Sequence, residues 1–165
     1  MKLRSSLAVL VATASMGLCL PGLAGADDSV SGSTVEISPN AARPAGPGPA
    51  ETFTGAVTVK PLFDPSGVRP FGSAQVSFTP SARTAWHSHP AGQTLVVSEG
   101  TGWVQQWGGL KQVITAGDVI WTPPGVKHWH GATDREAMTH TAIQAMLDGE
   151  VVDWMEHVSV AQYLS

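Results

Sequence analysis

The chain has 165 residues, the size of a single domain, and it is 42% hydrophobic and 13% charged, which is typical of a soluble globular protein. Its 9 basic and 13 acidic residues give a net charge of −4 and are spread without blocks, which excludes a basic surface for nucleic acid or lipid. After the N-terminus, no apolar run is long enough to cross a membrane.

Residues 1–26 are typical of a secretory signal peptide. Lys2 and Arg4 form a positive start, residues 7–20 are apolar, and small residues precede Ala26. We therefore predict cleavage after Ala26, a periplasmic or secreted protein, and no membrane attachment once the signal is removed. An uncleaved membrane anchor is the alternative.

Cys19 is the only cysteine and lies within the predicted signal. It leaves open a lipoprotein as a further alternative, but the mature chain would have neither a disulfide nor a thiolate nucleophile. Residues 27–50 are rich in Ser, Gly, Pro and Ala, and we interpret them as a flexible tether. The alternative is a strand-like arm that wraps a partner subunit.

Residues 51–165 form the predicted domain, in which apolar residues alternate with a period of two. Turn residues divide it into short candidate strands: 53–61, 74–79, 84–89, 94–99, 102–107, 111–115, 118–121, 128–132 and 137–147. Such regular spacing favours an all-β sandwich or barrel. Only the tail favours helix, as a short turn with Ser159 as its N-cap.

The histidines are unevenly placed. One residue separates His87 from His89, and one separates His128 from His130, so each pair projects from one face of a strand. If that face is interior, the imidazoles need a metal ion or hydrogen-bond partners, because burying unpaired polar groups is costly. Gln93 adds an oxygen donor at the start of the next strand.

Two motifs resemble those of the cupins. They are His87-Ser-His-Pro-Ala-Gly-Gln93, followed by Gly100, and Gly117-Asp-Val-Ile-Trp-Thr-Pro-Pro-Gly125-Val-Lys-His128. The resemblance covers nearly all of the mature domain. It implies a double-stranded β-helix, the cupin jelly-roll barrel, with a divalent metal ion held by His87, His89, Gln93 and His128.

Four further stretches narrow the resemblance to the bacterial cupin-type (R)-selective hydroxynitrile lyases, which bind manganese. These stretches are Ala82-Arg-Thr-Ala-Trp-His-Ser-His-Pro-Ala-Gly-Gln-Thr-Leu95, Lys127-His-Trp-His-Gly-Ala132, and Ala137-Met-Thr-His140 with Val152-Asp-Trp-Met-Glu-His-Val158. The resemblance makes Mn²⁺ the favoured ion, with Fe²⁺, Ni²⁺, Co²⁺ and Zn²⁺ as alternatives. It also places His130 and His140 on histidines implicated in proton transfer.

Gln93 departs from the family pattern, because most cupins carry Glu at this position. A neutral amide leaves the full charge on the cation, which makes it a stronger Lewis acid and removes a carboxylate base. The alternative is that Gln93 only hydrogen-bonds a ligand histidine.

These features predict a lyase that cleaves or forms cyanohydrins from an aromatic aldehyde and HCN, with His130 or His140 as the base. Either histidine alone fits equally well as a core residue that shapes the pocket. The alternatives are an Fe- or Ni-dependent dioxygenase, a non-catalytic periplasmic cupin that binds a metal or a small molecule, and another metal-assisted lyase or isomerase acting on a carbonyl compound.

Strand alternation also predicts a substrate wall. Its candidates are Ala74, Val76, Phe78, Trp121, Met138 and Gln144. Trp86 and Trp129 fall on the opposite face, where we expect them to pack the outer sheet or a dimer contact. Because exposed edges of small jelly rolls are commonly covered by another subunit, we expect a homodimer or a homotetramer.

Overall fold

The computed structural model describes residues 34–165, so the predicted signal peptide and the first part of the predicted tether lie outside the described residues. Ile37–Ser165 forms one unit. Within the described part of the chain, no helix is long and apolar enough to span a membrane.

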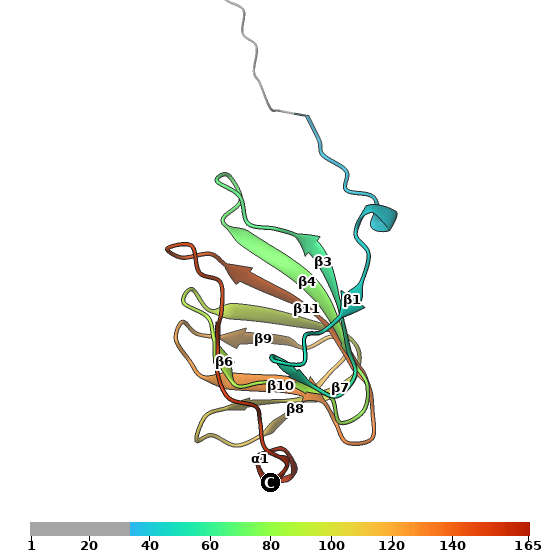
Figure 1. The fold of residues 1–165 in the computed structure, drawn as a ribbon, viewed down its shortest axis with the longest axis vertical. Coiled ribbons are helices and arrows are strands. Elements are labelled where there is room, and N and C mark those ends of the chain that lie inside the picture. Colours follow the sequence, from blue (N-terminus) through green and yellow to red (C-terminus); the bar gives the residue numbers. More distant parts are fainter. Residues whose placement is uncertain (1–33) are drawn as a thin grey trace, which may run out of the picture. The chain divides into compact units, whose positions relative to one another are not determined.

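The unit is built almost entirely from strands (Figure 1), which confirms the all-β prediction and its short C-terminal helix. The elements are η1 (Asn40–Ala42), β1 (Gly46–Pro47), β2 (Phe53–Thr54), β3 (Val57–Phe63), β4 (Phe71–Phe78), β5 (Arg83–Thr84), β6 (His87–Ser88), β7 (Gln93–Gln106), β8 (Gln112–Thr115), β9 (Val119–Thr122), β10 (His128–Ala132), β11 (Met138–Ala145), β12 (Asp153–Trp154) and α1 (Val160–Leu164).

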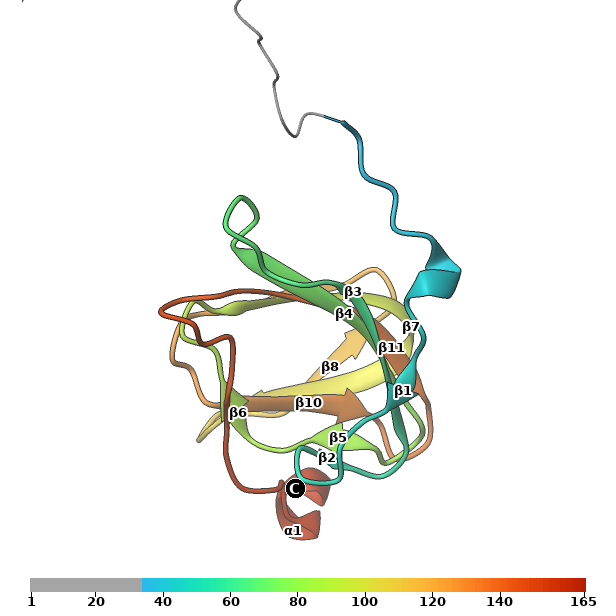
Figure 2. The ribbon, with the colours of Figure 1, turned by 45° about the horizontal axis from the view of Figure 1, so that its top comes forward.

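The strands form one curled antiparallel sheet in the order β1-β3-β4-β11-β7-β10-β5-β2, as Figure 2 shows. Off this path, β6 pairs with β10 and β12, while β8 and β9 pair with β7. The sheet curls because β7 is long enough to pair with β9 and β11 in one half and with β8 and β10 in the other. The interior therefore receives side chains from both halves.

β7 differs from the sequence prediction, which divided it into two strands around Gly100. The structure makes it one strand of 14 residues that bends at this glycine. Gly100 has a φ of 73°, and a Cβ there would lie 1.9 Å from the carbonyl oxygen of Ala137. Glycine is required at this bend because β11 passes so close, and that contact is invisible in the local sequence.

Alternating side chains fill the interior with an apolar cluster. Its buried members are Val57, Val76, Phe78, Ala82, Val97, Val104, Ile114, Ala132 and Met138. The histidines follow the same alternation: along β11, Met138, His140 and Ala142 are all buried. The core and the imidazoles therefore share one interior.

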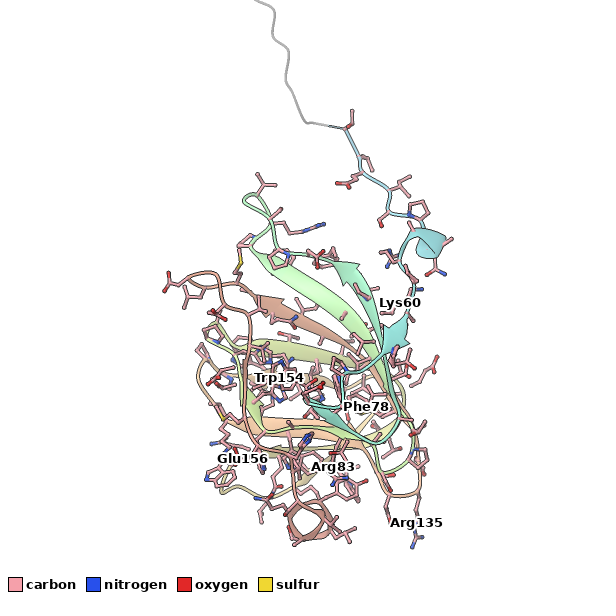
Figure 3. The ribbon with its side chains drawn as sticks, in the orientation of Figure 1. Lys60, Phe78, Arg83, Arg135, Trp154 and Glu156 are labelled. Atoms are coloured by element: carbon pink, nitrogen blue, oxygen red, sulfur yellow. The ribbon has the colours of Figure 1, made fainter. Side chains whose placement is uncertain are left out.

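The C-terminal segment packs against the outside of β10. Trp86 and Trp129 are buried beneath it with Val158 and Tyr163, so the two tryptophans pack the outer sheet as expected. Arg83 donates to the carbonyl oxygen of Val158 at 3.0 Å, and its guanidinium lies near α1 (Figure 3), 4.5 Å from the ring centroid of Tyr163. The predicted N-cap is confirmed, because Ser159 and Gln162 form a capping box.

The segment before the domain contains a short strand. Within residues 27–50, interpreted from the sequence as a flexible tether with a strand-like arm that wraps a partner as the alternative, β1 pairs with β3 of its own chain, with Gly46 opposite Val59. The amide of Gly48 also donates to the carbonyl oxygen of Val57 at 2.8 Å. Pro47 suits this place because an edge strand can lack an N–H donor. We refer to residues 44–49 as the arm.

Candidate metal centre

Two strands bring the paired histidines together. β6 and β10 run antiparallel with His87 directly opposite His128, so the imidazoles of both pairs project into the interior. The ring centroids of His87 and His128 are 4.3 Å apart, and those of His87 and His89 are 5.1 Å apart. His140 joins them from β11, with its ring 4.7 Å from that of His130. All five side chains are buried.

Backbone carbonyls fix the tautomers of three of these rings. The Nδ1 atoms of His87 and His128 each lie 3.0 Å from a carbonyl oxygen, of Ala85 and Val126 respectively, and Nδ1 of His89 lies 2.6 Å from that of Val151. A carbonyl only accepts, so each Nδ1 carries the hydrogen, and a neutral ring then has its lone pair on Nε2.

These three rings are neutral near pH 7 because their pKa values are lowered. Burial, with the neighbouring His128 adding to it, holds the pKa of His87 well below its usual value of 6.5. Burial also lowers the pKa of His89, and it lowers that of His128 to about 4. The Nε2 atoms are therefore unprotonated, as metal ligands must be.

The Nε2 atoms lack proton donors, which is the feature a cation would satisfy. Nε2 of His89 is buried with no hydrogen-bond partner anywhere in residues 34–165. Nε2 of His128 faces Oε1 of the buried Gln93 at 3.1 Å, so two acceptors confront each other unless the amide is turned to donate. Three imidazole nitrogens and an amide oxygen with these orientations fit a divalent metal ion.

His130 also contributes to this cluster. The structure brings one nitrogen each of His87, His128 and His130 within 4.8 Å of one another, a spacing that could hold a metal ion. Sequence analysis predicted His87, His89, Gln93 and His128, so the two sets share two histidines. His89 is not in the second set, although its ring centroid lies 5.7 Å from that of His128, and the Val151 carbonyl oxygen accepts from its Nδ1.

His130 and His140 form a hydrogen-bonded pair, with Nδ1 of His130 3.0 Å from Nε2 of His140. Their outer nitrogens, Nε2 of His130 and Nδ1 of His140, are buried and unpartnered within the described part of the chain. Burial lowers the pKa of His140 to about 4 and that of His130 well below 6.5. Both rings are therefore neutral and able to accept a proton. Thr84, which sequence analysis missed, accepts from the amide of His130 at 3.2 Å and anchors the pair.

The candidate metal centre borders a cavity of about 570 Å³, a volume suited to a small organic molecule. Four of the histidines and Gln93 line it, and its other walls are mostly apolar. Phe53 and Trp154, the latter labelled in Figure 3, line it as well. The Trp154 ring lies 4.7 Å from that of His87. Neither aromatic residue was predicted from the sequence, because each reaches the cavity through long-range strand pairing, of β2 with β5 and of β12 with β6.

The predicted substrate wall is only partly in the cavity. Ala74, Val76 and Gln144 line it, whereas Phe78 and Met138 belong to the core cluster. Trp121 corrects the prediction, because its side chain is 58% exposed on the outer face of β9 while the next residue, Thr122, points inward. The indole packs over Gly92, where a Cβ would lie 2.4 Å from the ring. The assumed alternation was therefore one residue out of phase.

Comparison with known proteins identifies the family. The Cupin domain model matches residues 74–143, which include the five buried histidines and Gln93. An (R)-mandelonitrile lyase of Granulicella tundricola is 53% identical over 129 residues, which are 78% of this chain and 98% of that protein.

The chain belongs to the cupin family. Among solved structures, a cupin-like protein from Thermotoga maritima has a TM-score of 0.68 and 40% identity, covering 71% of this chain and 89% of its own. A cupin 2 barrel protein from Rhodopseudomonas palustris has a TM-score of 0.57 at 15% identity, covering 68% of this chain and 77% of its own, and it shows likeness of fold alone. The barrel fold is therefore shared with these structures.

The buried histidines should make the metal-free cupin sensitive to acid. In the folded chain the pKa of His128 and of His140 is about 4, whereas an ordinary histidine has a pKa of 6.5. Below pH 6.5 the unfolded chain therefore binds protons that the folded chain does not. The free energy of unfolding should then fall between pH 7 and pH 4, by about 3 kcal/mol for one such histidine. Urea titrations of chelated protein at several pH values would measure this.

Replacing a buried histidine separates this effect from general acid sensitivity. His140→Phe should flatten the pH dependence, whereas His157→Gln, at an exposed histidine, should leave the unfolding free energy at pH 7 unchanged. An unfolding free energy that is constant from pH 7 to pH 5 in the chelated protein would contradict the assignment of neutral buried rings.

Proposed function

We propose that this cupin is a metal-dependent hydroxynitrile lyase that cleaves and forms cyanohydrins of aromatic aldehydes. One observation carries the proposal: one nitrogen each of His87, His128 and His130 lie within 4.8 Å of one another, and the hydrogen-bonded His130–His140 pair lines a largely apolar cavity beside them. The similarity to an (R)-mandelonitrile lyase supports this reaction among those that such a site allows.

Four residues would hold the ion: His87, His89, Gln93 and His128. Their donors are uncharged, so a bound divalent cation would act as a Lewis acid and stabilise negative charge on the substrate hydroxyl oxygen as its proton leaves. We propose Mn²⁺ as the resident ion, although Fe²⁺, Ni²⁺, Co²⁺ and Zn²⁺ also accept nitrogen and oxygen ligands.

The His130–His140 pair would move the proton. If Nδ1 of His130 donates to Nε2 of His140, then Nε2 of His130 presents its lone pair in the cavity and accepts the hydroxyl proton. The O–H bonding pair becomes the carbonyl π bond, and the pair of the C–CN bond leaves with cyanide. His130 then returns the proton to cyanide, which gives aldehyde and HCN with no net change in the enzyme.

The depressed pKa values of the two histidines suit this role. A buried imidazolium is unstable, so the protonated ring gives up its proton readily to cyanide, the conjugate base of a weak acid. His140 shares the transient positive charge through its hydrogen bond to His130. The largely apolar walls offer few competing hydrogen-bond partners, which strengthens these electrostatic interactions.

We also propose that the enzyme works outside the cytoplasm, on the strength of the signal-like residues 1–26, and that it assembles as a homodimer or homotetramer. Val96, Val119 and Trp121 lie on the outer faces of adjacent strands β7 and β9 and are exposed, which supports a subunit contact there.

Elemental analysis coupled to a mandelonitrile cleavage assay tests the proposed reaction. The purified protein should carry about one divalent metal ion per chain. Chelation should abolish cleavage, and Mn²⁺ should restore it. Undiminished cleavage after complete chelation would contradict the metal dependence. Oxygen uptake with a catechol, flavonol or thiol, in the absence of cyanohydrin cleavage, would favour a dioxygenase.

A further inference from the structure

The arm lines the cavity together with the barrel strands. Pro44, Gly46, Pro47 and Pro49 belong to the lining, although they precede the residues that match the cupin family. None of the three prolines has an N–H group, so their side of the cavity is poor in hydrogen-bond donors. With Phe53 and Trp154 also in the lining, the arm adds apolar wall to a cavity that the histidines and Gln93 also line.

Backbone and side-chain contacts hold the arm in place. Gly46 and Pro47 pair with Val59 and Thr58 of β3, and the amide of Phe53 donates to the carbonyl oxygen of Pro49 at 3.0 Å. Gly48 lies against the Phe53 ring so closely that a Cβ on it would approach the ring to 2.7 Å. The arm is therefore a fitted part of the cavity wall.

Gly46 occupies a special position in this wall. It lies directly opposite Val59, and residues opposite each other in an antiparallel pair project from the same face. Val59 lines the cavity, whereas its neighbour Thr58 is exposed on the other face, so a side chain at position 46 would also point toward the cavity.

Neither the backbone nor packing demands glycine at this position. A Cβ on Gly46 would meet no atom of residues 34–165 within 4 Å, and Gly46 is outside the left-handed region of φ. Glycine usually weakens a strand relative to residues with a side chain, so its presence here leaves space at a cost in stability.

We propose that the arm is the size filter of the active site and that residue 46 sets how large an apolar substrate tail the cavity accepts. This inference rests on the proposed function, because it takes the histidine cluster as the place of reaction. Glycine at position 46 leaves space for a large substituent, so the preferred substrates are aldehydes and cyanohydrins with bulky aromatic tails.

A graded series at position 46 tests the filter. Gly46→Ala, Gly46→Leu and Gly46→Phe should weaken binding of 2-naphthaldehyde progressively, by about tenfold or more for Phe, and leave binding of propanal within about twofold. Gly67→Phe is the matched control, because a Cβ on Gly67 would also meet no atom of the described chain within 4 Å, yet Gly67 lies outside the cavity lining. Calorimetric titration of each metal-loaded variant measures both affinities.

Metal content and thermal unfolding of each variant show that the barrel is intact, and Gly46→Leu keeps the test decisive if Gly46→Phe does not fold. Unchanged binding of 2-naphthaldehyde in Gly46→Leu and Gly46→Phe would overturn the filter. An equal loss for naphthaldehyde and propanal would also overturn it. A wild-type protein that binds these aldehydes but cleaves no cyanohydrin would contradict the proposed function and leave the comparison of affinities valid.

Discussion

Replacing His130 and His140 together with alanine is expected to abolish cyanohydrin cleavage while the metal ion stays bound. The physical reason is that no other neutral imidazole with an unpartnered nitrogen lies in the described cavity outside the predicted ligand set. General-base catalysis is worth about 10²–10⁴-fold, so kcat for mandelonitrile should fall by about that factor. Steady-state kinetics and elemental analysis of the same preparations measure the two properties.

Single replacements of His130 and His140, and of an exposed histidine as a control, show whether the loss of cleavage is specific to the pair. His140→Ala should retain more activity than His130→Ala, because His130 keeps a nitrogen in the cavity when its partner is lost. His157→Ala, at an exposed histidine, should behave as wild type in both assays. The unfolding free energy of each variant is measured in parallel, since removing a buried imidazole leaves a cavity.

Two results would contradict this assignment. Cleavage that persists in the double variant with its metal ion in place would rule out the pair as the base. Loss of the metal ion from His130→Ala alone would make His130 a ligand, as the spacing of His87, His128 and His130 allows. In that second case, His140 would be the remaining candidate for the base.

The cluster of buried histidines was predictable because its signal is local. His87 and His89, like His128 and His130, sit two apart in strands, and this spacing alone puts each pair on one face. That the two faces meet depends on the pairing of β6 with β10, which no local pattern encodes. The resemblance of the motifs to those of cupins supplied that information.

The rest of the cavity could not be predicted for the same reason. Trp154 reaches His87 only because β12 pairs with β6, and the arm reaches the cavity only because Gly46 pairs with Val59. Trp121 was misplaced for a different reason. In a short strand such as β9, an alternation that is assumed one residue out of step assigns every side chain to the wrong face of the sheet. Local alternation thus predicts which residues share a face, and long-range pairing decides which face is interior.

His89→Ala and Gln93→Leu are expected to lose the metal ion, because each removes a donor that belongs to the predicted ligand set. Even residues that only orient ligands change metal affinity about 10–100-fold, so removing a direct donor should weaken binding by more than about a hundredfold. Competition with a chelator of known affinity measures the loss. Gln144→Leu is the matched control, since Gln144 lies opposite Gln93 in the sheet and also lines the cavity.

Gln93→Glu separates a ligand from a hydrogen-bond partner of His128. If Oε1 of residue 93 binds the ion, a carboxylate should hold the ion at least as tightly, yet its negative charge should lower kcat because it weakens the Lewis acid. If the Gln93 amide only donates to Nε2 of His128, a carboxylate would confront that unprotonated nitrogen and destabilise the fold. A variant with weaker metal binding and a lower unfolding free energy would therefore contradict ligation by Gln93. Tight binding with slow turnover would instead show that the neutral amide tunes the ion for catalysis.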